Sequence, residues 1–448
     1  TLIDWSSVES EVAEYLRDLL RINTTNPPGN ETLAAQYIAD VLARGGFEPN
    51  VTESAPGRGN VTTRYDTGDQ ESPLLLLGHT DVVATEPKMW SHDPFGGDLD
   101  DGYIWGRGAL DMKNMVAAEL MVMLLLRRES RKLNRPILFA ATADEEAGKG
   151  DHGPGWLLDH YPDQIEAPVV LTEGGGHDLQ IGSQRYYTCC VGQKGICRMR
   201  VTARGRPGHG SMPHDDNAVV KLCAALSGFD GGGLRIHPSK TLRTYLDGIA
   251  KHQSLELANK LRAVLEPEHS DQAIIDLPLD EDFKGELRSL LRNTASLTML
   301  NAGSKINVIP SEATVSIDGR LVPGQTDESF IVELRQQIGD ELEIQVDQYS
   351  PPLEADPEGE FYGVIEQVMD RFDPGVPVIP SLMTGGTDAK HICPRRPNTQ
   401  VYGFMPYRQQ PGLEEMRLIH GHDERTSVAN LLFATRVIYD IVIEYGSS

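Results

Sequence analysis

The 448-residue sequence lacks the features that mark membrane proteins and nucleic-acid-binding proteins. No apolar run approaches the roughly 18–20 residues that a membrane-spanning helix needs. The N-terminal segment spaces its apolar side chains as an amphipathic helix does, so we expect no signal peptide there. The net charge is -25 and there is no basic patch, which argues against a nucleic acid as the partner.

Cysteine is scarce as well. The five cysteines are an odd number and show no Cys-x-x-Cys spacing. This argues against a disulfide framework and against a zinc site built from thiolates. We therefore expect buried free thiols in a reducing compartment, which favours a cytoplasmic protein.

Two kinds of pattern divide the chain. A chain of this length is too long for one ordinary core, so two domains are expected. Through the first 190 residues, the short apolar runs PLLLLGH, RPILFAATAD and APVVLTEG alternate with helical patterns such as DMKNMVAAELMVMLLLRR. This alternation predicts an α/β domain, a mainly parallel sheet with helices on both faces.

A different pattern begins near residue 193. The segments GICRMRVTARG and ATVSIDGRLVPG alternate apolar and polar residues, as half-exposed strands do. We predict one α/β domain formed by residues 1–191 and 350–448, with an α+β domain inserted at 192–349. Within that insertion, residues 229–295 are predicted to form an extra, largely helical segment.

Polar residues follow the predicted buried strands at the points where the strands end. In open α/β sheets, sites form beyond the carboxyl ends of the strands, so we expect these side chains to converge. They are His79 and Asp81, Asp111 before the long helix, the acids Asp144, Glu145 and Glu146, then Glu173, and finally His420 and His422 before the last helix.

This inventory suits a metal centre. Histidines with carboxylates are the ligands of catalytic zinc, with cobalt or manganese as alternatives. The acids exceed the needs of one ion, and two ions sharing one carboxylate would use them. Each motif alone has a simpler interpretation: a helix cap or a core histidine for His79, a solvated charge run for the three acids, and a cap on the final helix for either late histidine.

In order along the chain, the motifs are GHTDVV, DGYIWGRGALDMKN, TADEEAG, LTEGG, GRPGHGSMP, NVIPSEA, DGRLVPG, GGTDAKH and IHGHDER. As a set, they resemble the dinuclear zinc peptidase family of aminoacylase, acetylornithine deacetylase, succinyl-diaminopimelate desuccinylase, glutamate carboxypeptidase and carboxypeptidase S. The likeness spans roughly residues 10–440. It implies that residues 1–191 and 350–448 form the catalytic, zinc-binding domain and that 192–349 form a lid or dimerisation domain. The form WGRGALDMKN and the long insertion are most similar to the carboxypeptidase S branch.

The resemblance implies two Zn2+ ions that share a bridging carboxylate. The implied ligands are His79, Asp111 and Glu173 for one ion, and Asp111, Glu146 and His420 for the other. Asp81 would orient His79 through a hydrogen bond to its free ring nitrogen. The family spacing, with the ligand four residues before Glu424, favours His420 over His422. The peptide bond after Asp111 would be cis.

The resemblance also implies the catalytic and substrate-binding residues. Glu145 would be the general base, taking a proton from a water that bridges the zinc ions and passing one to the leaving amine. His209 would steady the oxyanion, often in the partner subunit's active site. The groups that would bind the substrate's carboxylate are Asn307, Arg320, Gly385, Gly386 and Thr387. The alternative for Arg320, a surface salt bridge on a strand, is the less favoured interpretation.

The implied activity is hydrolysis of an amide bond beside a free carboxylate, by a carboxypeptidase or dipeptidase or by an N-acyl-amino-acid hydrolase with an apolar preference. A succinyl-diaminopimelate desuccinylase or acetylornithine deacetylase is the alternative within the family. A binding protein without activity is disfavoured, because every implied ligand and the base are present. The protein would be a monomer or a homodimer, since the segment 229–295 would hinder the usual dimer contact.

One motif favours a different class of protein. GKGDHG, residues 148–153, matches G-x-G-x-x-G, and Glu173 lies twenty residues beyond it, as in a dinucleotide-binding oxidoreductase. Asp144, Glu145 and Glu146 separate this motif from the preceding strand, and their charges would repel a pyrophosphate. We therefore favour the hydrolase.

Overall fold

The computed structural model describes residues 3–66, 68, 71–147, 152–231, 233–413 and 415–448. The chain forms two compact units, each of which is described by itself. Unit 1 comprises Thr1–Val191, Ala355–Pro380 and Thr387–Ser448, and unit 2 comprises Gly192–Glu354 and Ser381–Gly386. Most of unit 2 is therefore inserted between two parts of unit 1.

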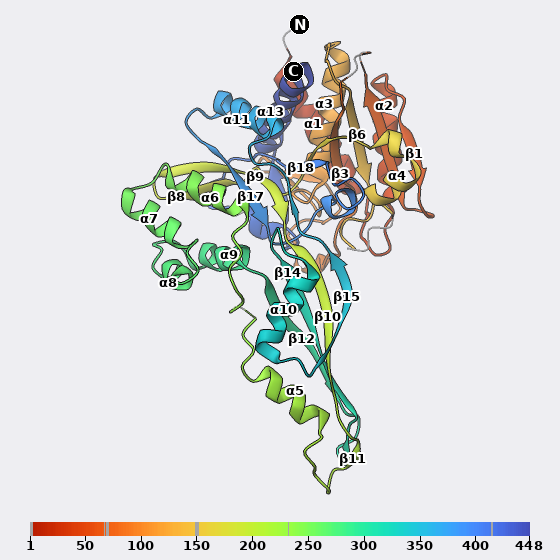
Figure 1. Ribbon diagram of the computed structural model, residues 1–448. Coiled ribbons are helices and arrows are strands. Elements are labelled where there is room, and N and C mark those ends of the chain that lie inside the picture. Colours follow the sequence, from red (N-terminus) through yellow and green to blue (C-terminus); the bar gives the residue numbers. More distant parts are fainter. Residues whose placement is uncertain (1–2, 67, 69–70, 148–151, 232, 414) are drawn as a thin grey trace. The chain divides into compact units, whose positions relative to one another are not determined.

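A mixed sheet forms the centre of unit 1 (Figure 1). Its strands are β1 (Asn50–Glu53), β2 (Gly59–Tyr65), β3 (Leu74–His79), β6 (Ile137–Thr142), β7 (Val169–Thr172), β8 (Asp178–Ile181), β9 (Gln184–Gln193), β17 (Val378–Met383) and β18 (Gln400–Gly403). The order is β1-β2-β6-β3-β7-β18-β9, and β8 and β17 also pair with β9. The run β6-β3-β7-β18 is parallel, which confirms the predicted α/β class.

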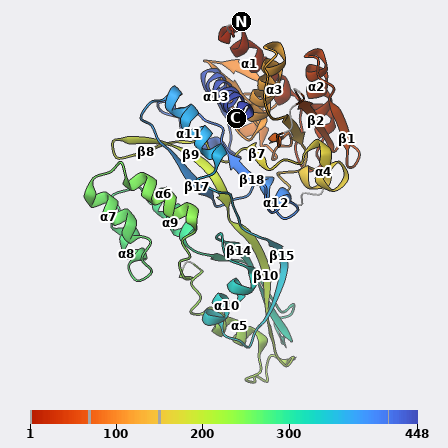
Figure 2. The same ribbon diagram turned by 45° about the horizontal axis from the view of Figure 1, so that its top comes forward.

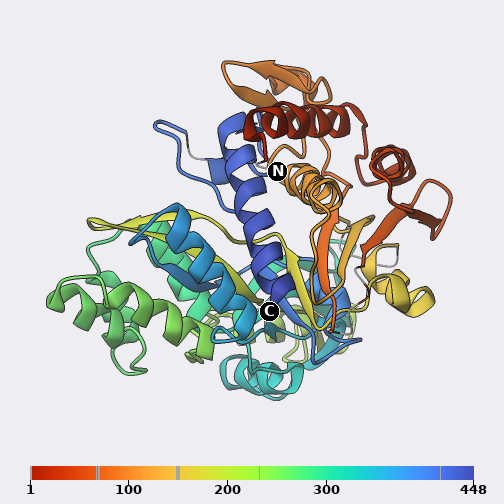
Figure 3. The same cartoon turned by 90° about the horizontal axis from the view of Figure 1, so that it is seen from above.

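Helices cover both faces of this sheet. They are α1 (Trp5–Arg21), α2 (Glu31–Arg44), α3 (Lys113–Arg128), α4 (Pro154–His160), α11 (Glu360–Phe372), α12 (Ala389–Ile392) and α13 (Val428–Ser447), with short 3-10 turns η1 (Pro87–Met89), η2 (Pro162–Gln164) and η3 (Glu415–Leu418). Helices α1, α3 and α13 pack against one another (Figure 3). Helix α3 is buried on all sides through Leu126, because its Ala, Leu and Met side chains lie between β3 and these two helices.

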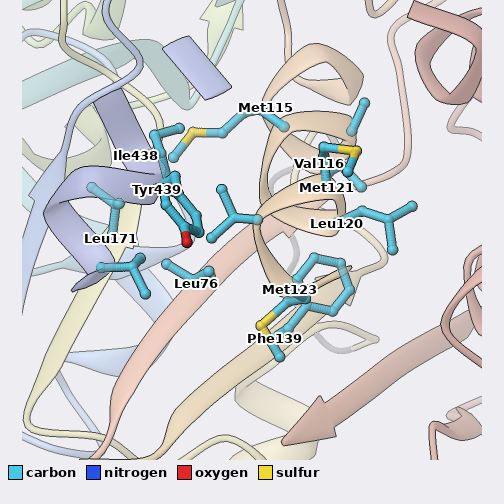
Figure 4. Close-up of a cluster of buried hydrophobic side chains, with 14 of the residues drawn as sticks. Leu76, Met115, Val116, Leu120, Met121, Met123, Phe139, Leu171, Ile438 and Tyr439 are labelled. Atoms are coloured by element: carbon cyan, nitrogen blue, oxygen red, sulfur yellow. The ribbon is translucent and has the colours of Figure 1, made fainter. Parts of the chain in front are cut away.

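The four leucines of β3 explain why this strand is a rigid support. Leu74 and Leu76 belong to the large core that includes α3 and α13 (Figure 4). Leu75 and Leu77 point the other way, into a second core with Leu157 of α4. Alternate residues of a strand face opposite sides, so both faces are filled. Each fully buried leucine contributes about 1.5–3 kcal/mol, which makes displacement of the strand costly.

A small sheet in unit 1 connects two distant parts of the sequence. It has the order β19-β5-β4, with β4 (Asp98–Asp100), β5 (Tyr103–Trp105) and β19 (Arg425–Ser427). The antiparallel register places Arg425 opposite Trp105. This pairing brings the segment after residue 419 beside the segment that leads to α3.

Unit 2 contains an antiparallel sheet of order β12-β14-β10-β15 (Figure 2). The strands of this sheet are β10 (Gly195–Arg204), β12 (Thr294–Ala302), β14 (Glu312–Leu321) and β15 (Glu343–Ser350). Unit 2 also contains β11 (Gly208–His209) and β13 (Val308–Ile309), which pair with each other, and β16 (Leu353–Glu354). Its helices are α5 (Ala218–Leu226), α6 (Lys240–Ala250), α7 (Leu255–Ala263), α8 (Ser270–Ile275), α9 (Glu281–Leu291) and α10 (Asp327–Ile338). Buried and half-exposed residues alternate along β14, as its sequence pattern predicts.

None of the helices among the described residues has both the length and the apolar character to cross a membrane. Cys189, Cys190 and Cys197 are buried, Cys393 is half-buried and Cys223 is exposed.

Candidate metal centre

Five of the predicted ligand side chains lie together in unit 1. His79 is the last residue of β3, Asp111 precedes α3, and Glu173 directly follows β7. Glu146 lies in the loop after β6, and His420 in the turn that follows η3. Three of these positions are the carboxyl ends of neighbouring parallel strands, so the sheet itself brings their side chains to one edge.

Asp111 lies between the two histidines. Its Oδ1 is 3.1 Å from His79 Nε2, and its Oδ2 is 3.1 Å from His420 Nε2. Each carboxylate oxygen therefore faces a different imidazole. The Asp111–Met112 peptide bond is cis, as the resemblance implies.

Each histidine has a second carboxylate beside it. Glu173 Oε1 is 3.5 Å from His79 Nε2, and Glu146 Oε2 is 3.2 Å from His420 Nε2. The arrangement is thus two sets of one imidazole and one carboxylate, with Asp111 common to both. His420 and the alternative ligand from the sequence, His422, are both exposed, but it is His420 whose Nε2 faces Asp111 and Glu146.

The donor atoms are close enough to hold cations. Donors of His79, Asp111 and Glu146 lie within 4.8 Å of one another, and so do donors of His79, Glu145 and Glu173. The second group includes the predicted base Glu145, which places its carboxylate among the ligands. Nitrogen and carboxylate oxygen donors without thiolates fit zinc, cobalt or manganese.

The electrostatics of the cluster favour positive counter-charge. Burial, together with the charge of Asp111, raises the pKa of Glu173 to about 8. Hydrogen bonds with Asp111 and Glu146 raise the pKa of His420 to about 10. Burial alone would lower the pKa of His79, but the neighbouring carboxylates raise it well above its usual value. Carboxylates gathered in a buried site are stabilised by a cation.

Asp81 contacts more than His79. Its backbone carbonyl lies 3.0 Å from His79 Nδ1, and its Oδ1 lies 3.5 Å from the same nitrogen. The carboxylate also accepts hydrogen bonds from the backbone N–H groups of Glu145 at 3.1 Å and Glu146 at 3.0 Å. Asp81 is fully buried, so it connects the strand that carries His79 with the loop that carries the acids.

Glu145 has a cationic partner that the sequence did not suggest. Lys390 Nζ donates to Glu145 Oε1 and, at 3.2 Å, to the backbone carbonyl of the same residue. Both side chains are about one-tenth exposed, so the ion pair is shielded from water. Lys390 follows the motif GGTD in the chain, and this proximity is the only sequence signal that points to it.

A second network of hydrogen bonds, from residues in the N-terminal part of the chain, supports the acidic loop, which is formed by Asp144, Glu145 and Glu146. Asn26 Nδ2 donates to Asp81 Oδ2 at 2.8 Å and to Asp144 Oδ1 at 2.9 Å. Arg58 donates to Asp144 at 2.9 Å and to both carboxylate oxygens of Glu31. Asp144 has a φ of 71°, an uncommon conformation for a residue with a Cβ, which these contacts hold.

The other predicted site residues are spread over both units. Thr387 belongs to unit 1, is buried, and its Oγ1 accepts from Ala389 N at 3.2 Å. In unit 2, the exposed His209 accepts at Nδ1 from the Ser211 N–H at 3.2 Å. Arg320 is paired there with Asp318 on its own strand, Nε to Oδ1 at 3.0 Å. The remaining predicted residues of unit 2 are Asn307, Gly385 and Gly386.

The dinucleotide-type motif at 148–153 falls mostly outside the described residues, which resume at 152. Its last glycine, Gly153, directly precedes α4.

A mainly parallel sheet whose carboxyl edge carries histidine and carboxylate donors around one shared aspartate is typical of a metallohydrolase. The model of peptidase family M20/M25/M40 matches residues 75–444, and the chain belongs to this family. It is therefore an enzyme, a metallopeptidase or amidohydrolase that cleaves amide bonds with metal ions. The resemblance drawn from the sequence motifs is confirmed.

Individual relatives agree with this assignment. The chain is 29% identical to the probable carboxypeptidase S-like 2 of Dictyostelium discoideum, over 80% of this chain and 69% of that protein. It is also 29% identical to the N-fatty-acyl-amino acid synthase/hydrolase PM20D1 of Xenopus tropicalis, over 79% of this chain and 69% of that protein.

Solved structures share the fold. The M20 family metallo-carboxypeptidase Sso-CP2 of Sulfolobus solfataricus superimposes with a TM-score of 0.68 at 16% identity, covering 97% of this chain and 99% of that chain. The YXEP protein of Bacillus subtilis, a dinuclear metal-binding peptidase of the M20 family, gives a TM-score of 0.63 at 13% identity, covering 98% of this chain and 99% of that chain.

Proposed function

We propose that this enzyme hydrolyses N-acyl amino acids with an apolar acyl group, and that small peptides with a free carboxylate beside the cleaved bond are its second substrate class. The relatives support both classes, one through its name as a fatty-acyl-amino acid hydrolase and one as a carboxypeptidase. The observation that carries the catalytic part is the position of Asp111 between His79 and His420.

The distances around Asp111 support the following proposed ligands. They are His79, Asp111 and Glu173 for one ion, and Asp111, Glu146 and His420 for the other. We propose zinc, with cobalt and manganese as substitutes, because imidazole and carboxylate donors suit these ions. Two such ions would polarise the amide carbonyl and supply hydroxide at neutral pH. Asp81 would hold His79 and the acidic loop in their places.

Glu145 is the proposed general base. Its carboxylate lies among the ligand donors and is about one-tenth exposed. It would accept the proton of the attacking water on a carboxylate oxygen and deliver it to the amine nitrogen as the C–N bond breaks. Lys390 Nζ contacts both this carboxylate and the backbone carbonyl of Glu145, and these two contacts would hold the base in position.

The remaining predicted residues are proposed to complete the reaction. Because His209 Nδ1 accepts a hydrogen bond from the Ser211 N–H, a neutral ring carries its proton on Nε2, which can donate to an oxyanion. Asn307, Arg320 and the loop Gly385–Thr387 would bind the substrate's carboxylate. Because Arg320 pairs with Asp318, the substrate's carboxylate would have to share the Arg320 guanidinium with Asp318 or take the place of Asp318 as its partner.

A substrate panel tests the proposal. It would contain N-acyl amino acids with short and long acyl chains, dipeptides, N-succinyl-diaminopimelate and N-acetylornithine, each assayed after metal removal and again after addition of Zn2+, Co2+ or Mn2+. We expect kcat/KM to be highest for apolar N-acyl amino acids and to depend on added metal. A strong preference for N-succinyl-diaminopimelate or N-acetylornithine would contradict the proposed substrate class, and turnover without metal would contradict the centre.

The oligomeric state and the cytoplasmic location stay predictions from the sequence. Mixing two inactive variants tests whether His209 acts on a partner subunit. Glu145→Gln lacks the base, and His209→Ala lacks the oxyanion donor. If His209 acts on the partner subunit, a mixed dimer has one complete site, formed by the intact Glu145 of one subunit and the intact His209 of the other. Restored activity on mixing would show action across subunits, and no restoration would show that each chain uses its own histidine.

A further inference from the structure

One buried ion pair joins the two segments that carry Asp111 and His420. Arg107 Nη1 donates to Glu424 Oε2 at 2.6 Å. Arg107 is 2% exposed and Glu424 is 0% exposed, so the pair is sealed from water. Arg107 stands four residues before Asp111, and Glu424 stands four residues after His420. The pair therefore links two chain segments that each contribute a proposed ligand.

The carboxylate of Glu424 also holds the backbone of the bridging aspartate. Its Oε1 accepts from Leu110 N at 2.7 Å and from Asp111 N at 3.1 Å. Its Oε2 accepts from Gly108 N at 3.2 Å in addition to Arg107. Both oxygens are thus occupied, and each fixes part of the segment 107–111. A buried carboxylate with this many donors holds its neighbours in one arrangement.

The turn that carries His420 is held from the same side. Arg107 Nη2 donates to the backbone carbonyl of Gly421 at 2.8 Å, and Gly106 N donates to the carbonyl of Glu424 at 3.0 Å. Asp423 accepts from Ser91 N at 2.6 Å and from Ser91 Oγ at 2.8 Å.

This turn has an unfavourable backbone. His420 has a φ of 59° and Asp423 a φ of 58°, both in the left-handed region that residues with a Cβ rarely adopt. Such a conformation persists only where the surroundings enforce it. The contacts of Arg107, Glu424 and Ser91 hold this turn, so we infer that they fix the backbone position of His420.

We propose that Glu424, paired with Arg107, is a positioning residue that sets the distance between Asp111 and His420 and thereby forms the second metal site. The inference rests on the proposed metal centre. His79 and Glu173 are mounted on β3 and β7 and belong to the first site only. Weakening the ion pair should therefore weaken the second ion more than the first.

Two variants break the link in different ways. Glu424→Gln keeps an oxygen that can accept from Leu110 N and Asp111 N. Its amide N–H2 group, however, faces the guanidinium of Arg107, and these two donor groups repel each other. Arg107→Lys keeps the positive charge but lacks the second arm that binds the carbonyl of Gly421. Asp178→Asn is the control, because it disturbs another Arg–carboxylate pair, partly exposed at Arg185, and neither Arg185 nor Gln409 is a proposed ligand.

Metal binding is measured directly, without substrate. Each metal-free protein is titrated with Co2+, the absorption of bound Co2+ is recorded, and the ions retained after desalting are counted by elemental analysis. Melting curves show that the variants are folded. We expect the wild type and Asp178→Asn to retain two ions per chain. Glu424→Gln should retain one, with the affinity for the second ion lowered about 10–100-fold, and Arg107→Lys should show a smaller loss in the same ion.

The outcomes separate the inference from the proposed function. Two ions of unchanged affinity in both folded variants would overturn the positioning role of Glu424 and leave the metal centre standing. An equal loss of both ions would also overturn it, because the second site would then not be singled out. A wild-type protein that binds fewer than two ions would overturn the centre and this inference together. If Glu424→Gln does not fold, the result for Arg107→Lys decides.

Discussion

The Asp81 carboxylate accepts a hydrogen bond from the backbone N–H of Glu146 at 3.0 Å, although the two residues leave different strands of the sheet. The same carboxylate approaches His79 Nδ1 and binds the N–H of Glu145. A single buried side chain thus connects a proposed ligand of each ion with the proposed base.

This relationship predicts the effect of Asp81→Asn. The amide keeps one acceptor oxygen where the carboxylate has two, so one of the backbone N–H groups at 145 and 146 would face an N–H2 group and lose its partner. We expect metal affinity to fall about 10–100-fold and kcat/KM with it. A titration of the metal-free variant with Zn2+ would show this, and wild-type affinity in the folded variant would contradict it. Asp66→Asn, an exposed aspartate, is the control.

Glu145→Gln separates metal binding from proton transfer. Glutamine cannot take up the proton of the attacking water, and general-base catalysis is worth about 10²–10⁴-fold in rate. We therefore expect kcat to fall by that factor while the number of ions per chain is unchanged. Elemental analysis and steady-state kinetics on the same preparation are the measurements. Turnover close to that of the wild type would refute the assignment of Glu145 as the base.

Glu119 is predicted to weaken the fold. It lies on α3, is 0% exposed, and neither carboxylate oxygen has a hydrogen-bond partner among the described residues. Burial raises its pKa well above the usual value. A buried polar group without a partner costs about 1–3 kcal/mol. Glu119→Met, which is apolar and similar in length, should therefore raise the free energy of unfolding at pH 7 by about that amount.

The pH dependence of this gain has a defined sign. The unfolded carboxyl ionises near its usual pKa of 4.5, whereas the folded one stays protonated to a higher pH. The unfolded state therefore gains stability as pH rises above about 4.5, so the wild type is destabilised in that window. Denaturant unfolding at pH 5 and pH 8 should show a larger gain for Glu119→Met at pH 8. An equal gain at both values, or a loss, would show that Glu119 is not held protonated.

The excess of acidic residues predicts a dependence on salt. With 66 acidic and 41 basic residues, the folded chain carries a net charge of -25, and its charges repel one another. The screening length falls from about 10 Å at 0.1 M salt to about 3 Å at 1 M. We expect the melting temperature to rise over this range, as measured by scanning calorimetry in NaCl. A falling melting temperature would mean that exposed ion pairs such as Arg204–Glu343, which salt screens as well, contribute more than the repulsion.

The fold and the edge that carries the site could be predicted from local patterns. The leucine run before His79 and the apolar runs before Glu145 and Glu173 each encode a buried strand within a few residues. The carboxyl ends of parallel strands meet at one edge, so the meeting of these side chains needed no further information. The resemblance then supplied their expected roles.

The supporting contacts could not be predicted in this way. Lys390 with Glu145, Arg58 with Asp144, and Arg107 with Glu424 each join segments that are far apart in the sequence. No periodicity or cap connects such pairs, because they exist only once the sheet and the β5–β19 pairing have set the segments side by side. Lysine, arginine and glutamate are common surface residues, so their types alone do not indicate burial.

The sharing of Asp111 between two metal ions is the feature on which the proposed function depends. Anomalous X-ray diffraction at the zinc edge, from crystals of the zinc-loaded enzyme, measures it directly. We expect two peaks in unit 1, one beside His79 and Glu173 and one beside His420 and Glu146, each in contact with one carboxylate oxygen of Asp111. A single peak, or two peaks without contact to Asp111, would contradict the dinuclear centre.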